Sequence, residues 1–495
     1  MGCGGSSPKS QNLLPTPAPF PNPQVSLTRL STDTFTNTTS QHATEVEPSV
    51  FAVGSTIVAA FQVGRIFGGG GADIGFATST NGGVSWTSGF LPGITTFQGG
   101  TFTAASDPSV TFDAAHNTWL ISTLPIGAVN EIAVSRSPDG LNWSGPVRVS
   151  TTPDADKNWI TCDNTPSSPF FGHCYVEWDD PSQQDLLFMS TSTDGGLTWK
   201  PGLNTAGHDT GIGGQPVVQP NGNVIVPLEG LFGSMLSFNS TNGGTSWSAA
   251  VTIANIFDHQ VAGGMRTDPL PSASIDSGGK VYVVWQDCSF RSNCASNDMV
   301  MSTSTDGTTW TTPARIPIDS VNSAVDHFIP GLAVDPVTSG ATAHLALVYY
   351  FYPNTNCSAA TCKLGAGFIS SQDGGSTWTA PTTLAGPMTV NWLPNTFSGL
   401  MVGDYMAAAF SGGKAYPIFT VAQAKSGSTF DEAIFTTTNA FSSALQRYVS
   451  TAAKRSGLRD VSVPNAHSDH PARRFYDLDH EHPIPQRKKA ARSHR

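Results

Sequence analysis

The chain has 495 residues, of which 50 are glycine, 35 are proline and only 12% are charged. The formal net charge is −11, which argues against a nucleic-acid-binding protein, and no run of 18 apolar residues occurs, so no transmembrane helix is predicted. Abundant glycine without a long helical period indicates an all-β chain with many tight turns.

The N-terminal residues predict a tether. Cys3 is followed by glycine and serine and then by a proline-rich stretch that ends at residue 23. This start resembles that of a mature bacterial lipoprotein, which implies a lipid on Cys3, membrane anchoring and a flexible spacer over residues 1–23. Gly2 and Ser6 also fit a myristoylation signal, and this alternative stays open.

One short phrase recurs along residues 24–440: Ser/Thr-x-Asp/Asn-Gly, followed by a tryptophan. Its acidic or amide positions are Asn81, Asp139, Asp194, Asn242, Asp306 and Asp373, with a degenerate copy at Asn439. The copies are 48 to 67 residues apart, and a repeat of this length indicates a propeller or a solenoid.

Each copy has a structural explanation. Asp/Asn-Gly favours a hairpin turn, the carboxylate can accept backbone N–H groups, and the tryptophan can pack against the neighbouring unit. We therefore predict that these residues hold turns and carry no catalysis.

The phrase resembles the Asp-box, the bacterial neuraminidase repeat, of the sialidase superfamily of β-propellers. The resemblance implies an all-β propeller of four-stranded antiparallel blades with Asp-box turns. Two more strand-like runs precede each box, the first often opening with x-Pro as in Glu47-Pro48. The count predicts seven blades, with the six of true sialidases as the alternative. The run at 24–30 is expected to close the ring as the outer strand of the last blade.

The cysteines indicate an oxidising compartment. Six of the seven fall in close pairs, which are Cys162/Cys174, Cys288/Cys294 and Cys357/Cys362. Local disulfides are predicted, with free thiols as the alternative. No pair has a histidine at zinc spacing, so no metal site is predicted.

Residues 441–495 differ in composition from the rest. This segment holds 11 Lys/Arg and 5 Asp/Glu, while the remainder is acidic, and few apolar residues follow Tyr448. A basic, mostly disordered tail is predicted.

In a propeller, the starts of the first strands and the ends of the second strands share the face opposite the box turns. Carboxylates with aromatic platforms on this face would suit a sugar. The predicted substrate-binding residues are Glu47, Arg65, Trp178, Arg266, Trp285, Arg291 and Asp404. Arg65, Arg266 and Arg291 are included because sialidases hold the substrate carboxylate with three arginines, whose fork pairs with it.

The resemblance also implies catalytic roles. Sialidases use a tyrosine nucleophile assisted by a glutamate, with an aspartate as acid/base. Tyr405 is the best-placed tyrosine, Glu229 or Glu47 would polarise it, and Asp107 would be the acid. The sialidase Phe/Tyr-Arg-Ile-Pro motif is not matched, because its only likeness, at 314–317, follows the fifth box and lacks the aromatic residue.

Two functions follow. One is a sialidase-like glycoside hydrolase acting on terminal acidic sugars of extracellular glycans. The other is a non-catalytic Asp-box propeller that binds glycan or protein partners. For both we expect a monomer without a cofactor that is secreted or anchored at the cell surface.

Overall fold

The computed structural model describes residues 19–150, 152, 154–442, 448–451 and 453–454. Cys3, its predicted lipid and most of the predicted tail lie outside these residues. The regular secondary structure of the described chain is β-strand apart from short 3-10 helices, and none of these helices has the length and apolar character needed to cross a membrane. The 3-10 helices are η1 (Thr96–Gln98), η2 (Pro181–Gln183), η3 (Ala262–Gly264), η4 (Ser292–Cys294), η5 (Gly340–Thr342) and η6 (Val390–Trp392).

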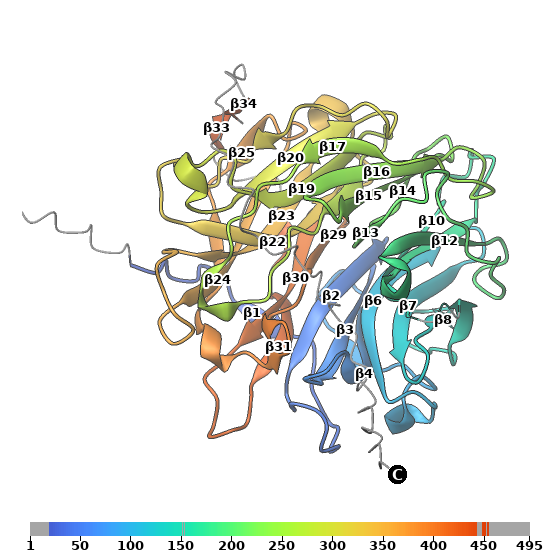
Figure 1. Ribbon diagram of the computed structural model, residues 1–495, viewed down its shortest axis with the longest axis horizontal. Helices are drawn as coiled ribbons and strands as arrows, with labels where there is room; N and C mark the ends of the chain where they lie inside the picture. Colours follow the sequence, from blue (N-terminus) through green and yellow to red (C-terminus); the bar gives the residue numbers. More distant parts are fainter. Residues whose placement is uncertain (1–18, 151, 153, 443–447, 452, 455–495) are drawn as a thin grey trace, which may run out of the picture.

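The strands form antiparallel sheets that follow one another along the chain (Figure 1). The first two sheets, joined by the single pair Gly71 and Ala105, contain β2 (Glu45–Val53), β3 (Thr56–Arg65), β4 (Gly71–Ser79) and β5 (Thr87–Phe90), then β6 (Ala104–Asp113), β7 (Thr118–Ile126), β8 (Ile132–Ser137) and β9 (Val147–Ser150). The third contains β10 (Asp156–Cys162), β11 (Cys174–Asp180) and β12 (Leu186–Ser192). The fourth contains β13 (Gly211–Ile212), β14 (Val217–Val218), β15 (Val224–Gly230), β16 (Ser234–Ser240) and β17 (Val251–Asn255).

The later sheets repeat this plan. The next contains β18 (Ser272–Ile275), β19 (Val281–Asp287), β20 (Asp298–Ser304) and β21 (Ala314–Arg315). It is followed by β22 (Asp326–Val334), β23 (Leu345–Tyr352), β24 (Lys363–Ser371) and β26 (Thr382–Thr389), and then by β29 (Ala407–Ser411), β30 (Lys414–Ala422), β31 (Glu432–Thr437) and β32 (Phe441–Ser442). The short β27 (Asn395–Thr396) and β28 (Gly399–Leu400) pair with each other.

An N-terminal strand completes the last sheet. β1 (Leu27–Arg29) pairs antiparallel with β31, with Leu27 opposite Thr437, and Arg29 forms an ion pair with Asp431 at 3.1 Å. The expectation that this segment would be the outer strand of the last unit is confirmed. The pairing joins the start of the described chain to its last sheet and covers an open sheet edge.

The segment after residue 441 is not free of regular structure. β33 (Tyr448–Thr451) pairs with β25 (Thr377–Thr379), and β34 (Ala453–Lys454) pairs with β21. The backbones of these residues therefore add to the edges of two sheets.

The Asp-boxes hold turns, as predicted. In the third copy the Ser192 hydroxyl donates to Asp194 Oδ1 at 2.8 Å, and the same oxygen accepts the backbone N–H of Thr198 at 3.0 Å. In the fifth copy the N–H groups of Thr309 and Thr308 lower the pKa of Asp306 to about 2. The carboxylates are therefore saturated with local donors.

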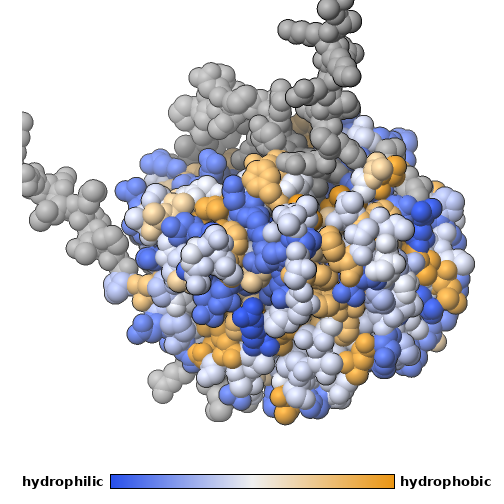
Figure 2. Space-filling view, turned by 90° about the horizontal axis from the view of Figure 1, so that it is seen from below, coloured by the Kyte–Doolittle hydropathy of each residue, from blue (hydrophilic) through white to orange (hydrophobic). Residues whose placement is uncertain are grey.

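The box tryptophans pack between sheets. Trp247 is buried, with its ring 6.1 Å from that of Tyr175 in the preceding sheet and 5.7 Å from that of Phe238 in its own. Trp143 similarly lies 5.9 Å from Phe76 of the preceding sheet. On the face that Figure 2 shows, hydrophobic residues lie in separate small patches between hydrophilic ones.

All three predicted disulfides are formed, joining Cys162 to Cys174, Cys288 to Cys294 and Cys357 to Cys362. Disulfides are typical of extracellular proteins, because the cytosol keeps thiols reduced.

Candidate functional site

Three consecutive first strands carry a bulge at matching places. The register of β2, β6 and β10 shifts between Val46 and Ser49, Ser106 and Ser109, and Asp156 and Trp159. Within these bulges Glu47, Asp107 and Lys157 have φ values of 57°, 45° and 45°. Positive φ is uncommon outside glycine, and a bulge changes the direction of a side chain. The bulges thus direct three charged side chains of neighbouring sheets to one place.

Side chains also join the first strands to each other. Ser49 Oγ of β2 accepts the N–H of Val110 on β6 at 3.1 Å, and Ser109 Oγ accepts the N–H of Ile160 on β10 at 3.3 Å. Ser272 Oγ of β18 accepts the N–H of Leu332 on β22 at 2.9 Å. These serines explain the recurring x-Pro-Ser phrase, because each hydroxyl satisfies a buried N–H of the next strand.

Lys157 is the centre of a buried charged cluster. Its Nζ lies 2.6 Å from Asp404 Oδ2, 3.1 Å from Asp107 Oδ1 and 3.5 Å from Glu47 Oε1. Arg266 forks onto the same carboxylate, with its Nε 2.8 Å from Asp404 Oδ1 and its second bond reaching Oδ2. The backbone N–H of Asp404 donates to Glu47 Oε1 at 3.3 Å. We call Glu47, Asp107, Lys157, Arg266, Asp404 and Tyr405 the Lys157 cluster.

Tyr405 is the one phenol of this cluster. Its hydroxyl donates to the carbonyl of Pro108 at 3.2 Å, next to Asp107, and its ring centroid lies 5.9 Å from Lys157 Nζ. The ring also makes an edge contact with Trp159, with centroids 5.2 Å apart. A phenol therefore stands beside the carboxylates.

The Lys157 cluster is closed to solvent. Lys157, Asp404 and Tyr405 are 4%, 5% and 7% exposed, and the other members are more deeply buried. Buried charges are tolerated only when paired, and here three carboxylates share two cations. Asp404 is the carboxylate that both Lys157 and Arg266 contact.

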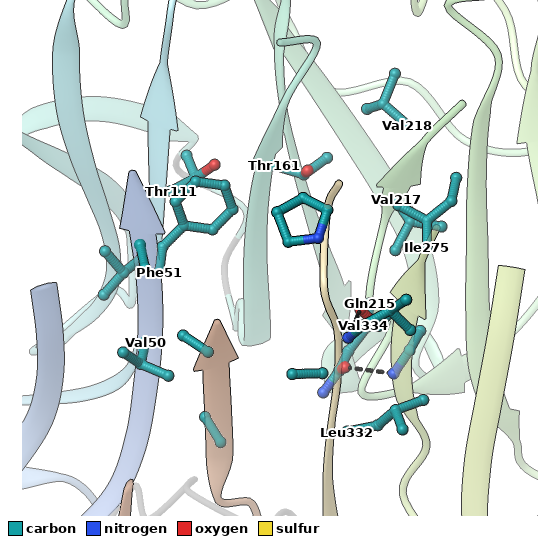
Figure 3. Close-up of a pocket in the computed structure, with 18 of the residues that line it drawn as sticks. Val50, Phe51, Thr111, Thr161, Gln215, Val217, Val218, Ile275, Leu332 and Val334 are labelled. Atoms are coloured by element: carbon teal, nitrogen blue, oxygen red, sulfur yellow. Dashed lines mark hydrogen bonds between the residues drawn. The ribbon is translucent and has the colours of Figure 1, made fainter. Parts of the chain in front are cut away.

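A cavity of about 470 Å³ lies along the first strands (Figure 3). Its walls come from β2, β6, β10, β14, β18, β22 and β29, and it extends from Trp159 and Gln215 to the turns at Pro220 and Pro336. Trp159 lines the cavity and also contacts Tyr405 of the Lys157 cluster.

Arg65 is linked to the Lys157 cluster through Gln62. This fully buried side chain donates from Nη1 to Gln62 Oε1 at 3.1 Å and to the carbonyl of Gly70 at 3.2 Å. The Gln62 amide bonds in turn to Glu47 and, at 2.7 Å, to Ser106.

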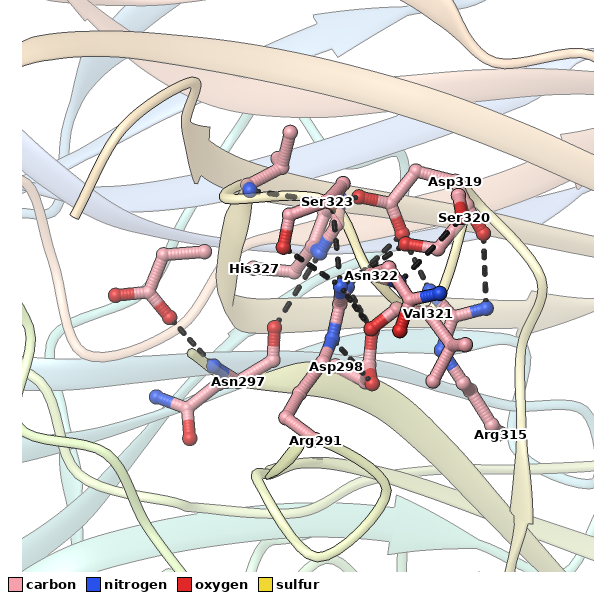
Figure 4. Close-up of polar contacts among 12 residues, drawn as sticks. Arg291, Asn297, Asp298, Arg315, Asp319, Ser320, Val321, Asn322, Ser323 and His327 are labelled. Atoms are coloured by element: carbon pink, nitrogen blue, oxygen red, sulfur yellow. Dashed lines mark hydrogen bonds and ion pairs between the residues drawn. The ribbon is translucent and has the colours of Figure 1, made fainter. Parts of the chain in front are cut away.

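Arg291 belongs to a different network (Figure 4). It forks onto Asp298, with bonds of 2.8 and 2.5 Å, and reaches Asp319 Oδ1 at 2.9 Å. Its Nη1 donates to the carbonyls of Ser320, Val321 and Ser323 at 3.0 to 3.1 Å. Arg291 thus clamps the 319–323 loop.

The same network includes a geometric candidate for metal binding. Ligand atoms of Asp298, Asp319 and His327 lie within 4.8 Å of one another. Arg291 and Arg315 already pair with both carboxylates, and burial lowers the pKa of His327. Two cations neutralise two carboxylates, so the residues present do not fit a metal ion.

Two predicted aromatic platforms are core residues. Trp178 and Trp285 are fully buried, Trp178 stacks on Phe188 at 5.5 Å, and Trp285 Nε1 lies 3.4 Å from Asp287 Oδ2. As sugar platforms these two assignments are wrong, because their rings are packed between sheets.

The two candidate glutamates occupy different places. Glu229 lies on β15 with its backbone opposite Ile212, whereas Glu47 contacts Lys157 directly.

Sequence reasoning does not select Lys157 and Trp159, because their strand lacks the proline of its neighbours. The sequence does contain a signal for Lys157. When Asn158 is aligned with Pro48 and Pro108 of the other first strands, Lys157 occupies the same position as Glu47 and Asp107.

No protein-family model and no curated protein matches the chain. Among solved structures it resembles the NanB sialidase from Streptococcus pneumoniae, at 13% identity and a TM-score of 0.41, over 84% of this chain and 71% of that one. A Hadza microbial sialidase matches at 12% identity and 0.41, over 81% of this chain and 66% of that one. A PL25 ulvan lyase matches at 10% identity and 0.47, over 80% of this chain and 94% of that one.

Proposed function

We propose that the protein is a seven-bladed Asp-box propeller that hydrolyses glycosides of terminal acidic sugars at the Lys157 cluster. Two observations support seven blades. Strands of seven sheets line one cavity, and β1 adds to the last sheet in the manner of a ring closure.

The observation that carries the hydrolase proposal is the grouping of carboxylates around Lys157. Glu47, Asp107 and Asp404 each place an oxygen within 3.5 Å of its Nζ. Any two of these oxygens are therefore at most about 7 Å apart, which is below the upper limit of roughly 9.5 Å for paired carboxylates in glycosidases. Tyr405 adds a nucleophilic hydroxyl at the same place.

The cations indicate an acidic substrate. Arg266 and Lys157 together bind the Asp404 carboxylate by a fork and an ion pair. A sugar carboxylate has the same shape and charge, so it would take the place of Asp404. Gly403, with a φ of 118°, precedes Asp404 and allows the backbone rotation that would withdraw it.

The reaction follows from the remaining groups. Asp107, protonated, gives its proton to the glycosidic oxygen as the bond from that oxygen to the anomeric carbon breaks. Tyr405 passes its phenolic proton to Glu47 and bonds to the anomeric carbon. Water then displaces the tyrosine oxygen and gives a proton to Asp107, while Glu47 returns its proton to Tyr405.

Turnover of fluorogenic acidic glycosides tests this proposal. We expect Tyr405→Phe to lower kcat at least about 100-fold, because the nucleophile is lost while the ring packing is kept. We expect Arg266→Lys to raise KM, because the fork that binds a carboxylate is lost.

Tyr416→Phe and Arg148→Lys are the matched controls. Tyr416 hydrogen-bonds to Gly82 of a box turn, and Arg148 pairs with Glu131 at the surface. Both variants should keep wild-type turnover. Wild-type rates in Tyr405→Phe would contradict the proposed nucleophile.

One observation favours a second function, a non-catalytic glycan-binding propeller. Every member of the Lys157 cluster is buried, and its cations are already paired in this structure. Binding of acidic glycans without hydrolysis of any glycoside in the panel would support this alternative.

A further inference from the structure

The cavity between the first strands is distinct from the Lys157 cluster, since no member of that cluster lines it. We propose that this cavity is a second binding site, for an uncharged sugar unit. Its volume of about 470 Å³ falls within the roughly 300 to 1,000 Å³ typical of ligand pockets. The inference stands on the cavity alone and does not require the hydrolase proposal.

The cavity wall carries no available charge. Asp276 is the one titratable residue among those that line it. Its Oδ1 accepts the N–H groups of Gly278 and Lys280, and its Oδ2 accepts bonds from Gly340 N–H and the Tyr282 hydroxyl. With this carboxylate engaged in holding turns, an ionic ligand would lose its hydration without gaining a counter-charge.

Three neutral polar groups on the wall are available to a ligand. Gln215 uses its Oε1 to accept the N–H of Ala273 at 2.9 Å. Its amide nitrogen, the Trp159 indole N–H and the Thr161 hydroxyl have no hydrogen-bond partner in the part of the chain that the structure describes. All three residues line the cavity, so they offer donors, and in Thr161 also an acceptor, to the hydroxyl groups of a sugar.

Apolar and aromatic surface lies beside these donors. Trp159, Phe51 and Phe410 line the cavity and are partly exposed. A sugar ring has apolar C–H faces and a polar rim, so it matches both kinds of surface at once. An alkyl chain would leave the three polar groups without partners, at an energetic cost.

Calorimetric titration with lactose, maltose and methyl glucoside tests the proposal. We expect at least one of these sugars to bind, and Gln215→Met to weaken that binding about tenfold, the usual effect of losing one good hydrogen bond. Thr161→Val should weaken it in the same direction. Gln183→Met, at an exposed glutamine of η2, is the matched control and should bind like the wild type.

Three results would overturn the proposal: no binding of any of the three sugars, equal binding by wild type and Gln215→Met, or binding of decanol in their place. Unfolding midpoints close to that of the wild type establish that the variants fold. Because the titration detects binding without turnover, its failure leaves the hydrolase proposal intact. Loss of acidic glycoside turnover in Tyr405→Phe leaves the proposed sugar site in the cavity intact.

Discussion

At the residue scale, the Lys157 ammonium is the cation that three carboxylates of the Lys157 cluster share. One ammonium group lies within ion-pair distance of Glu47, Asp107 and Asp404, and it is almost completely buried. Removing one partner from a buried ionic group costs far more than a surface ion pair contributes, because the remaining charges have neither water nor a counter-ion.

Lys157→Met should therefore destabilise the protein by about 3 to 5 kcal/mol. Urea unfolding monitored by tryptophan fluorescence measures this change. Lys363→Met, at an exposed lysine on β24, should change stability by less than about 0.5 kcal/mol. Equal urea midpoints for the two variants would contradict the prediction, because the buried carboxylates would then not need the Lys157 ammonium as a counter-charge.

Sequence reasoning locates part of this cluster. Glu47, Asp107 and Asp404 are predicted because they stand at or near the starts of first strands, and the bulges there do bring Glu47 and Asp107 together. Trp178 and Trp285 are misassigned for a physical reason. The end of a second strand is also where large side chains fill the space between sheets. Periodicity alone does not distinguish an aromatic residue on a binding face from one that is packed between sheets.

At the element scale, the repeated phrases have local causes and are read well from sequence. The hydrogen bonds of the Asp-box form between its own residues, as Ser192, Asp194 and Thr198 show, so the sequence of the box predicts its structure directly. The N-terminal strand was also predictable, because the last unit lacked an outer strand.

The contacts between first strands were not predictable in this way. Ser109 accepts a hydrogen bond from Ile160, a residue 51 positions away. A single serine after a proline gives no indication of which strand it will bond. The bulges are similarly hidden, since their positive φ values fall on Glu47, Asp107 and Lys157 and not on glycine.

At the scale of the whole molecule, buried acids set the pH dependence of stability. Burial raises the pKa of Asp73 and Asp326 to about 8 and that of Glu45 to about 7. Burial also places the pKa of Glu177 and Glu432 well above the ordinary value. In the unfolded chain such groups titrate near pH 4, so the folded state binds more protons between about pH 4 and 8.

Stability should therefore fall as pH rises from about 4.5 to 8, because unfolding in this range releases protons. Below pH 4 the trend should reverse, since Asp306, with its pKa lowered to about 2, loses its turn contacts as it is protonated. Urea unfolding at pH 3, 5, 6.5 and 8 measures this curve. Asp326→Asn should flatten the decline, and stability that rises steadily from pH 5 to 8 would contradict the prediction.

The most direct test of the central claim is a crystal structure of the protein soaked with N-acetylneuraminic acid. The account predicts density for the sugar at the Lys157 cluster, with its carboxylate within about 3 Å of the Arg266 and Lys157 nitrogens and Asp404 withdrawn. Density for the acidic sugar at any other place, with Asp404 still bound to Arg266, would contradict it.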